Sequence, residues 1–280
     1  MSYFNVHKLL SKTQFGFIPG RSAMIQLLAV MDKWTEGLEE PGQIDIIYTD
    51  FEKAFDKVCH SKLISKLNSY GINSSVINWI NDYLNHREFN VIVNGTLSNS
   101  FEASSGIPQG SVLGPLLFVV FINDLPMACN DNYLYLFADD AKLFRIIRSI
   151  IDAEVLNQDC KNMFEWCKNW SMNVNVSKCK VLSLHPNRSS ENYDYSFQGN
   201  NSDEFLTHVE EYSDLGVLID SKLSFKDHIH NMVNKANRNL GLIRRNFNNI
   251  DIDSFKVLYF TLVRSNLEYC HSVWNPHTVE

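Results

Sequence analysis

Phe137-Ala138-Asp139-Asp140 places two adjacent carboxylates between two segments of alternating character, Tyr133–Phe137 and Ala141–Ile147. Such alternation is typical of half-buried strands, and the short connection predicts a hairpin with the acids in its turn. Neighbouring carboxylates repel each other and burial adds to that cost, whereas a divalent cation removes both objections. An exposed Asp-Asp turn without function has the same pattern, so the pair alone leaves both interpretations open.

Asp50 ends another strand, far away in the sequence. Ile44–Thr49 is a short apolar run with β-branched residues, which indicates a buried strand. If this strand shares a sheet with the hairpin, three carboxylates can converge at one edge. Two metal ions about 3.5–4 Å apart, bridged by such acids, would activate a 3′-hydroxyl and stabilise in-line displacement of pyrophosphate.

The rest of the pattern mixes helices and strands without a strict βαβ rhythm. Apolar periodicity predicts helices at Ala23–Leu38, His60–Tyr70, Ser74–Leu84, Ser111–Leu125 and Asp152–Trp170, and from Phe225 onward. Asn94-Gly95 predicts a hairpin turn between Phe89–Val93 and Thr96–Ala103, and further strands are predicted at Val181–Leu184 and Tyr212–Ile219. This order favours an α+β domain with helices packed on one face of an antiparallel sheet.

The charge of the chain is unevenly distributed. Its 280 residues carry a net charge of -7, which argues weakly against nucleic acid as a partner. Between Lys222 and Arg264, however, basic residues outnumber acidic ones. Such a local basic face can bind phosphate because salt screens charge beyond about 8 Å. A solvated helix face is the alternative interpretation of this segment.

Cysteine spacing and hydropathy point to a reducing compartment. The six cysteines form no CxxC pair and are expected to be small apolar residues. The most apolar stretch, Val112–Ile122, is too short for a bilayer. We expect an intracellular protein that does not span a membrane. The sequence does not distinguish nucleus from cytoplasm, and no obligate protein partner is evident.

Six ordered blocks resemble the conserved motifs of reverse transcriptases. Tyr48–Asp56 looks like motif A, Ser105–Pro115 like motif B and Phe137–Asp140 like motif C. The other blocks are Gln14–Ser22, similar to the motif preceding A, Asn175–Lys178, similar to motif D, and Tyr212–Gly216, similar to motif E. The residues of these blocks are most similar to those of non-LTR retrotransposon polymerases of the jockey type.

The resemblance implies an RNA-directed DNA polymerase with a right-hand architecture. Its parts would be partial fingers at residues 1–43, a palm at 44–221 with a fingers insertion at about 60–104, and an incomplete helical thumb at 222–280. The partners would be an RNA template, a DNA primer and dNTPs. The cofactor would be two Mg²⁺ ions, with Mn²⁺ as a substitute.

The resemblance also implies roles for individual residues in catalysis and nucleotide selection. Asp50, Asp139 and Asp140 would be the catalytic metal ligands, joined by the backbone carbonyl of Phe51. The ring of Phe55 would exclude a 2′-hydroxyl and so select deoxynucleotides; a core phenylalanine is its alternative. The incoming nucleotide would also meet three further residues, which are Gln109, Gly110 and Lys178.

Template and primer contacts are implied at five further positions, which are Arg21, Pro108, Tyr212, Leu215 and Gly216. A surface arginine is the alternative for Arg21. The chain departs from the family at Ile18, where arginine is usual, and at Cys179, where threonine is frequent. Only thirteen residues precede Gln14, so we expect a fingers region truncated at its N-terminus.

Two rival functions remain at this point. The chain could be an inactive remnant of an element that at most binds nucleic acid. An unrelated metal hydrolase would explain Asp139 and Asp140, but it would leave Phe55 and the block from Gly106 to Pro115 unexplained.

Overall fold

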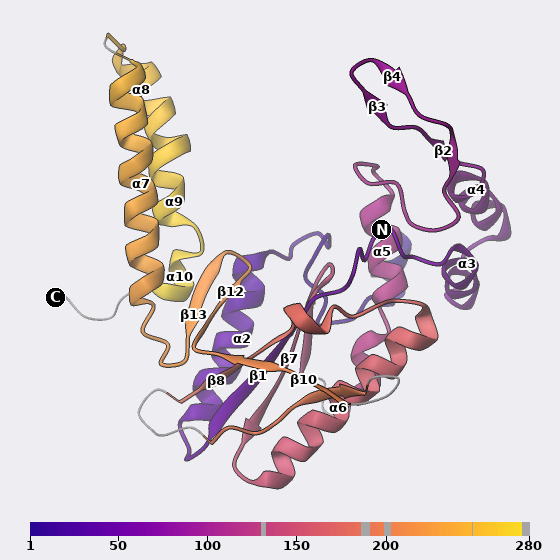
Figure 1. Ribbon diagram of the computed structural model, residues 1–280, viewed down its shortest axis with the longest axis horizontal. Helices are drawn as coiled ribbons and strands as arrows, with labels where there is room; N and C mark the ends of the chain where they lie inside the picture. Colours follow the sequence, from indigo (N-terminus) through magenta and orange to yellow (C-terminus); the bar gives the residue numbers. More distant parts are fainter. Residues whose placement is uncertain (130–132, 186–190, 199–202, 248, 276–280) are drawn as a thin grey trace.

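A mixed sheet forms the centre of the molecule. The computed structural model describes residues 1–129, 133–185, 191–198, 203–247 and 249–275. In these residues a five-stranded sheet has the order β11-β8-β1-β7-β6. Its strands are β1 (Gln43–Thr49), β6 (Leu134–Phe137), β7 (Asp140–Ile147), β8 (Lys180–Leu184) and β11 (Thr207–Val209). β1 lies in the middle, antiparallel to β7 and to β8 (Figure 1).

The central strand is buried along its whole length, as the apolar run predicted. Ile44, Ile46 and Tyr48 pack into one apolar cluster, and Ile47 packs into another on the opposite face. Side chains of a strand alternate between faces, so β1 contributes to two cores at once. This position explains why its residues are apolar on both faces.

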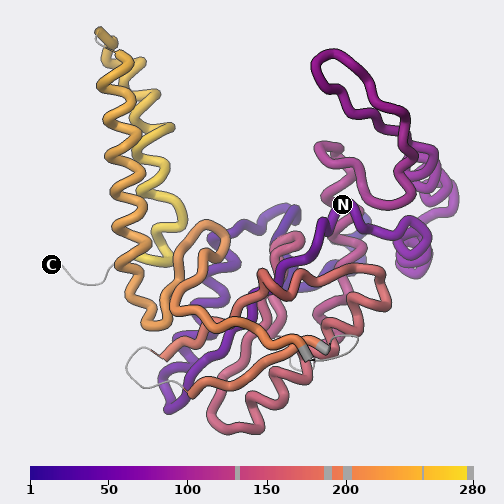
Figure 2. The backbone as a smooth tube through the Cα atoms, viewed as in Figure 1, coloured from indigo at the N-terminus to yellow at the C-terminus, as the bar shows by residue number. Residues whose placement is uncertain are grey.

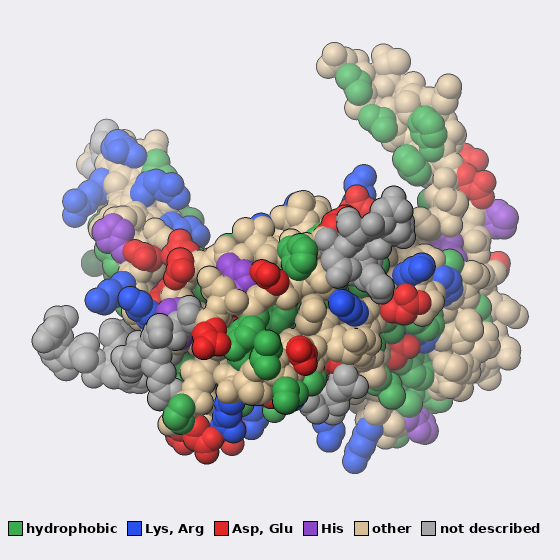
Figure 3. Space-filling view, turned by 60° about the horizontal axis from the view of Figure 1, so that its bottom comes forward, with side chains coloured by type: hydrophobic (Ala, Val, Ile, Leu, Met, Phe, Trp, Pro, Cys, Tyr) green, Lys and Arg blue, Asp and Glu red, His purple; other side chains and the backbone are tan. Residues whose placement is uncertain are grey.

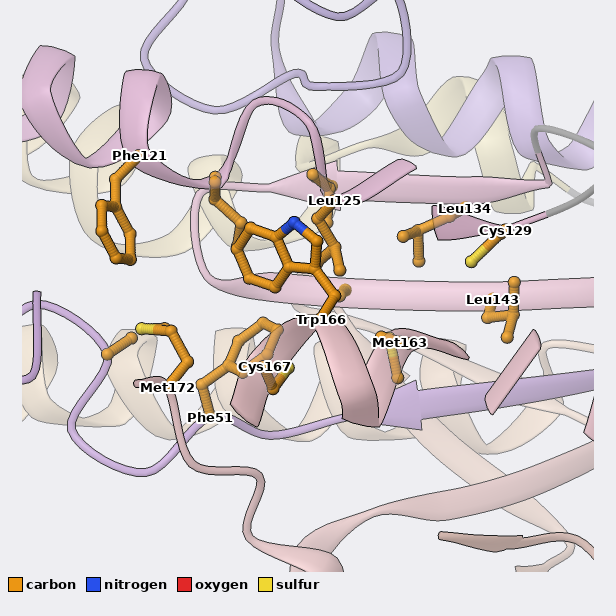
Figure 4. Packing of buried hydrophobic residues seen from close by; sticks show 14 of the residues in the cluster. Phe51, Phe121, Leu125, Cys129, Leu134, Leu143, Met163, Trp166, Cys167 and Met172 are labelled. Carbon is orange, nitrogen blue, oxygen red and sulfur yellow. The ribbon is translucent and has the colours of Figure 1, made fainter. Parts of the chain in front are cut away.

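Helices cover both faces of the sheet, which corrects the prediction of helices on one face. The main helices that pack on the sheet are α2 (Ala23–Leu38), α5 (Gly114–Ile122) and α6 (Ile150–Trp170). Trp34 of α2 packs edge-on against Phe144 on one face. On the other face α6 supplies Met163, Trp166 and Cys167 to the larger core (Figure 4). A central strand that is apolar on both sides requires this second layer.

Three further details differ from the sequence prediction. The sheet is not wholly antiparallel, because β11 pairs parallel to β8. Tyr212–Ile219 is not one strand but a hairpin of β12 (Glu211–Asp214) and β13 (Val217–Asp220). Leu215 and Gly216 turn the chain there with φ of 47° and 85°. α5 begins at Gly114 rather than Ser111, because the Ser111 hydroxyl accepts the Gly114 N–H and Pro115 occupies the first turn.

A long hairpin projects beyond two short helices (Figures 1 and 2). The helices are α3 (His60–Ser69) and α4 (Ser74–Leu84), and the hairpin strands are β2 (Glu88–Phe89), β3 (Ile92–Val93), β4 (Thr96–Leu97) and β5 (Phe101–Glu102). Asn94 and Gly95 both have positive φ, at 50° and 80°, which a type I′ turn requires. The predicted hairpin is confirmed, with its pairing split into two ladders.

A helical arm follows the sheet and stands apart from the hairpin in Figure 2. It consists of α7 (Lys226–Asn246), α8 (Ile252–Leu258), a π-helix (Tyr259–Arg264), α9 (Ser265–Glu268) and α10 (His271–Trp274). Ala236, Ile243 and Val263 form a small apolar cluster that holds the arm together. The end of the arm next to the sheet is anchored by Phe225, Cys270 and Val273, which belong to the same apolar cluster as Trp34 of α2. No helix of the described residues is long and apolar enough to cross a membrane.

The remaining elements are short. They comprise α1 (Ser2–Val6), the 3₁₀ turns Leu125–Ala128 and Val176–Lys178, and the strands β9 (Ser196–Gln198) and β10 (Asp203–Phe205), which pair with each other.

A buried ion pair joins the sheet to the β12–β13 hairpin. Lys142 of β7 bonds to Asp214 of β12, with side-chain exposures of 2% and 4%. The Tyr48 hydroxyl also donates to Asp214, at 3.4 Å. Burial lowers the pKa of Lys142, while the charge of Asp214 opposes that shift. Each charge therefore depends on its partner for compensation.

Replacing Lys142 alone with Met should destabilise the fold by about 3–5 kcal/mol, because it leaves Asp214 buried and unpaired. The double variant Lys142→Met/Asp214→Leu should be more stable than Lys142→Met. Urea unfolding at pH 7 measures both free energies. Lys33→Met, which breaks the exposed pair of Lys33 with Glu36, is the control and should leave the free energy of unfolding nearly unchanged. If the double variant lost as much stability as the two single substitutions added together, the result would contradict the pairing.

Candidate functional site

The pairing of β1 with β7 brings the three predicted catalytic acids to one edge of the sheet. Thr49 pairs with Ala141, and its hydroxyl donates to the Ala141 carbonyl at 3.0 Å. Asp50 follows Thr49, and Asp140 precedes Ala141, so both acids leave their strands at the same end. Phe137 pairs with Asp140, which leaves Ala138 and Asp139 as the two-residue turn. The predicted hairpin is thereby confirmed.

The acids lie close enough to affect one another electrostatically. Burial raises the pKa of Asp139, and the charge of Asp50 raises it further. Burial also raises the pKa of Asp140, followed by the charges of Asp139 and Asp214. Carboxylates that repel one another at a half-buried edge are suited to a hard divalent cation.

The donor set fits such a cation in its chemistry, but it is not gathered around a single point. The described residues contain no group of three or more His, Cys, Asp or Glu side chains placed to hold a metal ion. Asp50 instead lies 3.6 Å from the ammonium of Lys178. The assignment of Asp50, Asp139 and Asp140 as metal ligands therefore stays a prediction.

The backbone beside Asp50 is fixed by the segment that carries Lys178. Phe51 forms a bridge with Val174, and the Asn175 N–H donates to the Asp50 carbonyl at 2.8 Å. Cys179 is buried beneath the strand end, and its Sγ accepts the Asp50 N–H at 3.5 Å. Burial raises the pKa of this thiol to about 11, so it stays protonated at neutral pH. The Phe51 side chain points into the core (Figure 4), and metal binding by its carbonyl stays a prediction.

Phe55 lies between the core and the surface. Its ring stacks on Phe118 of α5 with centroids 4.2 Å apart, and Phe17 meets it edge-on at 6.4 Å. The ring is half-buried, so part of its surface is exposed. This position is compatible with a phenylalanine of the core and also with a ring that selects deoxynucleotides.

The loop before α5 is joined to the loop after β1. The Ile107 N–H donates to the Phe55 carbonyl at 2.9 Å, and Gln109 donates to the Asp56 carboxylate at 3.0 Å. Gly106 has φ of 82°, and a Cβ there would lie 2.7 Å from the Asp56 carbonyl. Only glycine allows this approach. The structure thus brings Gln109 beside the loop that carries Phe55.

Two side chains that were not predicted from the sequence hold this loop through the Gly106 carbonyl. The Gly106 carbonyl accepts from Arg87 at 2.7 Å and is 2.8 Å from the ring nitrogen of buried His60. Pro108 accepts from the Ser111 hydroxyl, and Gly110 has an open surface with φ of 77°. Nothing in the sequence marks Arg87 or His60 as partners of this loop, because both lie far from it along the chain.

The β12–β13 hairpin sits next to the acids. Tyr212 stacks on Tyr48 with centroids 3.8 Å apart. Burial raises the pKa of Tyr212 to about 12, with Asp140 as the next cause. Leu215 accepts from the Tyr269 hydroxyl at 2.8 Å, and the Tyr269 ring lies against Gly216. The pairing of Lys142 with Asp214 was not predicted from the sequence, because the two residues lie far apart along the chain.

Arg21 is engaged within the protein. Its Nη1 donates to the carbonyls of Ser11 at 2.9 Å and Lys12 at 3.0 Å, and also to that of Gln14. The guanidinium also lies over the Phe15 ring, 5.2 Å from its centroid. These contacts give Arg21 a structural role in the loop before α2. Template binding by Arg21 stays a prediction.

Most of the chain matches one known protein family. Residues 2–219 match the family described as reverse transcriptase (RNA-dependent DNA polymerase). The chain belongs to this family. Reverse transcriptases generally use divalent metal ions. The fold is accordingly the α+β palm of these polymerases, as the resemblance implied.

The relatives include polymerases of non-LTR retrotransposons. The chain is 30% identical over 236 residues to the RNA-directed DNA polymerase from mobile element jockey of Drosophila melanogaster, covering 81% of this chain and 25% of that protein. It is 29% identical over 243 residues to the probable RNA-directed DNA polymerase from transposon BS of the same species, covering 79% and 25%. The chain thus spans about a quarter of these relatives.

A solved telomerase shares the fold. The structure of telomerase from Candida tropicalis in complex with a fragment of telomeric RNA matches with a TM-score of 0.54 and 11% identity. The match covers 93% of this chain and 43% of the telomerase. At this identity the likeness concerns the fold alone.

The raised carboxyl pKa values predict a stability cost at neutral pH. The folded chain binds these protons more tightly than the unfolded chain, so stability falls as pH rises above the ordinary aspartate pKa of about 3.9. Without metal, Asp140→Asn should therefore raise the melting temperature at pH 7 by about 1–4 °C. The gain should shrink toward pH 4.5.

Differential scanning calorimetry in EDTA measures this gain. Asp82→Asn changes an exposed acid of α4 and should leave the melting temperature within about 1 °C. A lower melting temperature for Asp140→Asn at pH 7 would refute the repulsion among the acids.

Proposed function

We propose that this chain is the RNA-directed DNA polymerase domain of a non-LTR retrotransposon, which adds dNTPs to a primer 3′-hydroxyl on an RNA template. The observation that carries the proposal is the register of β1 on β7, which brings Asp50 to the edge where Asp139 and Asp140 stand. Membership of the reverse transcriptase family and similarity to the jockey polymerase support it.

The proposed division of the chain follows the sequence prediction. Residues 1–43 belong to the fingers, 44–221 to the palm with the insertion at about 60–104, and 222–280 to the thumb. The hairpin of β3 and β4 and the helical arm are separate projections of one palm (Figure 1), in agreement with this division. Figure 3 shows Lys and Arg side chains on the arm, where a thumb would meet the phosphates of a duplex.

Asp50, Asp139, Asp140 and the Phe51 carbonyl would hold two Mg²⁺ ions. These ions, when bound, lower the pKa of the primer hydroxyl and neutralise charge on the phosphates. The positions of the acids at the sheet edge would fix where the ions bind. Lys178, whose ammonium lies 3.6 Å from Asp50, would protonate the departing pyrophosphate.

The proposed nucleotide-binding residues lie on two adjoining loops, one after β1 and one before α5. Phe55 excludes a 2′-hydroxyl with its ring, while Gln109 and Gly110 contact the incoming nucleotide. Template and primer would be contacted at Arg21, Pro108, Tyr212, Leu215 and Gly216. Stacking of Tyr212 on Tyr48 makes the β12–β13 hairpin a firm support for the primer end.

Asp139→Asn should reduce Mg²⁺-dependent incorporation of dTTP on poly(rA)·oligo(dT) by about a hundredfold or more, because it removes a charge that the transition state needs. Glu52→Gln is the matched control, since it removes an exposed charge two residues after Asp50 and should retain activity. Unchanged extension by Asp139→Asn would rule out the assigned chemistry. Template-primer binding without any incorporation by the wild-type chain would instead support an inactive remnant.

Phe55→Ala should raise the use of ribonucleotides relative to deoxynucleotides by at least about tenfold, because the ring no longer occupies the space of the 2′-hydroxyl. The ratio of kcat/KM for UTP and dTTP measures this selectivity. Phe55→Tyr retains the ring and should retain the selectivity. An unaltered ratio in Phe55→Ala would assign the ring to the core alone.

A further inference from the structure

Gln14 binds the turn that carries the catalytic acids. Its Oε1 accepts the Ala138 N–H at 3.0 Å, and its Nε2 donates to the Ala138 carbonyl at 3.4 Å. The same Oε1 accepts the Gly16 N–H at 2.7 Å. The glutamine is completely buried, so its amide is committed to these three backbone groups. One side chain thus holds both polar groups of the residue that precedes Asp139.

Ala138 needs such a partner. It has φ of 55°, a conformation that costs a residue with a Cβ roughly 1–2 kcal/mol. It is also buried, and buried backbone groups require hydrogen-bond partners. Ala138 and Asp139 form the turn of the hairpin, so the ladder between β6 and β7 ends at the pair formed by Phe137 and Asp140. The amide of Gln14 supplies the partners that the ladder does not.

The segment around Gln14 is itself fixed against the sheet. The Phe15 N–H donates to the Leu136 carbonyl at 2.7 Å, and the Leu136 N–H donates to the Thr13 carbonyl at 2.9 Å. A Cβ on Gly16 would lie 2.2 Å from the Ala138 nitrogen, so the backbone of Gly16 lies directly on the turn. Arg21 holds the same segment through the Gln14 carbonyl. Gln14 is therefore presented from a rigid support.

A second buried glutamine offers an internal comparison. Gln26 is also completely buried and donates to the Leu136 carbonyl at 2.9 Å. It bonds the body of β6, two residues before Ala138, and makes no bond to the turn. The two glutamines have the same chemistry and burial, and only Gln14 bonds the residue whose conformation directs Asp139.

We propose that Gln14 is a positioning residue for the catalytic acids: its amide holds Ala138 in the left-handed conformation from which Asp139 and Asp140 leave the turn toward Asp50. The inference rests on the proposed polymerase function, in which these acids hold metal. Gln14 itself touches no reacting group. Its loss should free the turn without dismantling the sheet.

The test uses the full chain labelled with ¹⁵N-alanine and the variant Gln14→Met, which keeps the length of the side chain but forms no such bonds. Amide hydrogen exchange of Ala138 should accelerate at least about tenfold, while that of Ala141, within the sheet, stays as in the wild type. Binding of Mn²⁺ alone, followed by electron paramagnetic resonance, should weaken by about 10–100-fold.

Gln26→Met is the matched control and should alter neither the Ala138 exchange nor the Mn²⁺ affinity. If Gln14→Met does not fold, Gln14→Asn carries the same expectation, because it keeps a polar group but falls one methylene short of Ala138. Wild-type exchange and Mn²⁺ affinity in the folded variant would overturn the proposal. Equal changes in the Gln14 and Gln26 variants would also overturn it, since they would indicate general loosening of β6.

Failure of the proposed function gives a different result. A wild-type chain that binds no Mn²⁺ and extends no primer, but shows faster Ala138 exchange on loss of Gln14, would refute the function and retain the structural clamp. A wild-type chain that binds Mn²⁺ and is unaffected by the substitution would refute the positioning role alone.

Discussion

Antiparallel pairing of β1 with β7 is the interaction on which the rest of the structure depends. Its register, with Thr49 opposite Ala141, fixes where Asp50 meets Asp139 and Asp140. A shift by one residue would turn Ile44 and Ile46 to the opposite face and separate the acids at the same time. The apolar faces of β1 therefore specify the site as well as the core, because one register satisfies both.

Like charges lie close together at the edge of the sheet that carries the three acids, and this lowers the stability of the fold. The surrounding contacts offset that loss. Asp139 and Asp140 have raised pKa values because they are partly buried and lie near other acids. Nearby, the ion pair of Lys142 with Asp214 compensates one further buried acid and ties the β12–β13 hairpin to the sheet. Such mutual repulsion is tolerated where function needs the charges, since the optimum for stability alone would remove them.

The loops around this edge are fixed mainly through backbone groups. Gly106 lies against Asp56, Val174 bridges Phe51, and Gln14 bonds Ala138. In each case a segment distant in sequence meets the backbone of a predicted site loop. Small residues at the points of closest approach allow this, because Gly16 and Gly106 leave no room for a Cβ. The side chains proposed to act on substrate are thus carried by loops that several distant segments hold in place.

The sequence by itself determined the residue chemistry and most elements of this protein. Alternation and apolar runs identified β1, β6, β7 and the Asn94-Gly95 hairpin, because those signals arise from neighbouring residues. It also identified the acids of the candidate site and the reverse transcriptase family, and the match over residues 2–219 confirmed the family. Tertiary structure decided that α2 and α6 cover opposite faces, that Tyr212–Ile219 folds into a hairpin, and that Gln14, His60 and Lys142 support the site. These contacts join residues far apart along the chain, and no local pattern records which distant backbone group a buried polar side chain will meet.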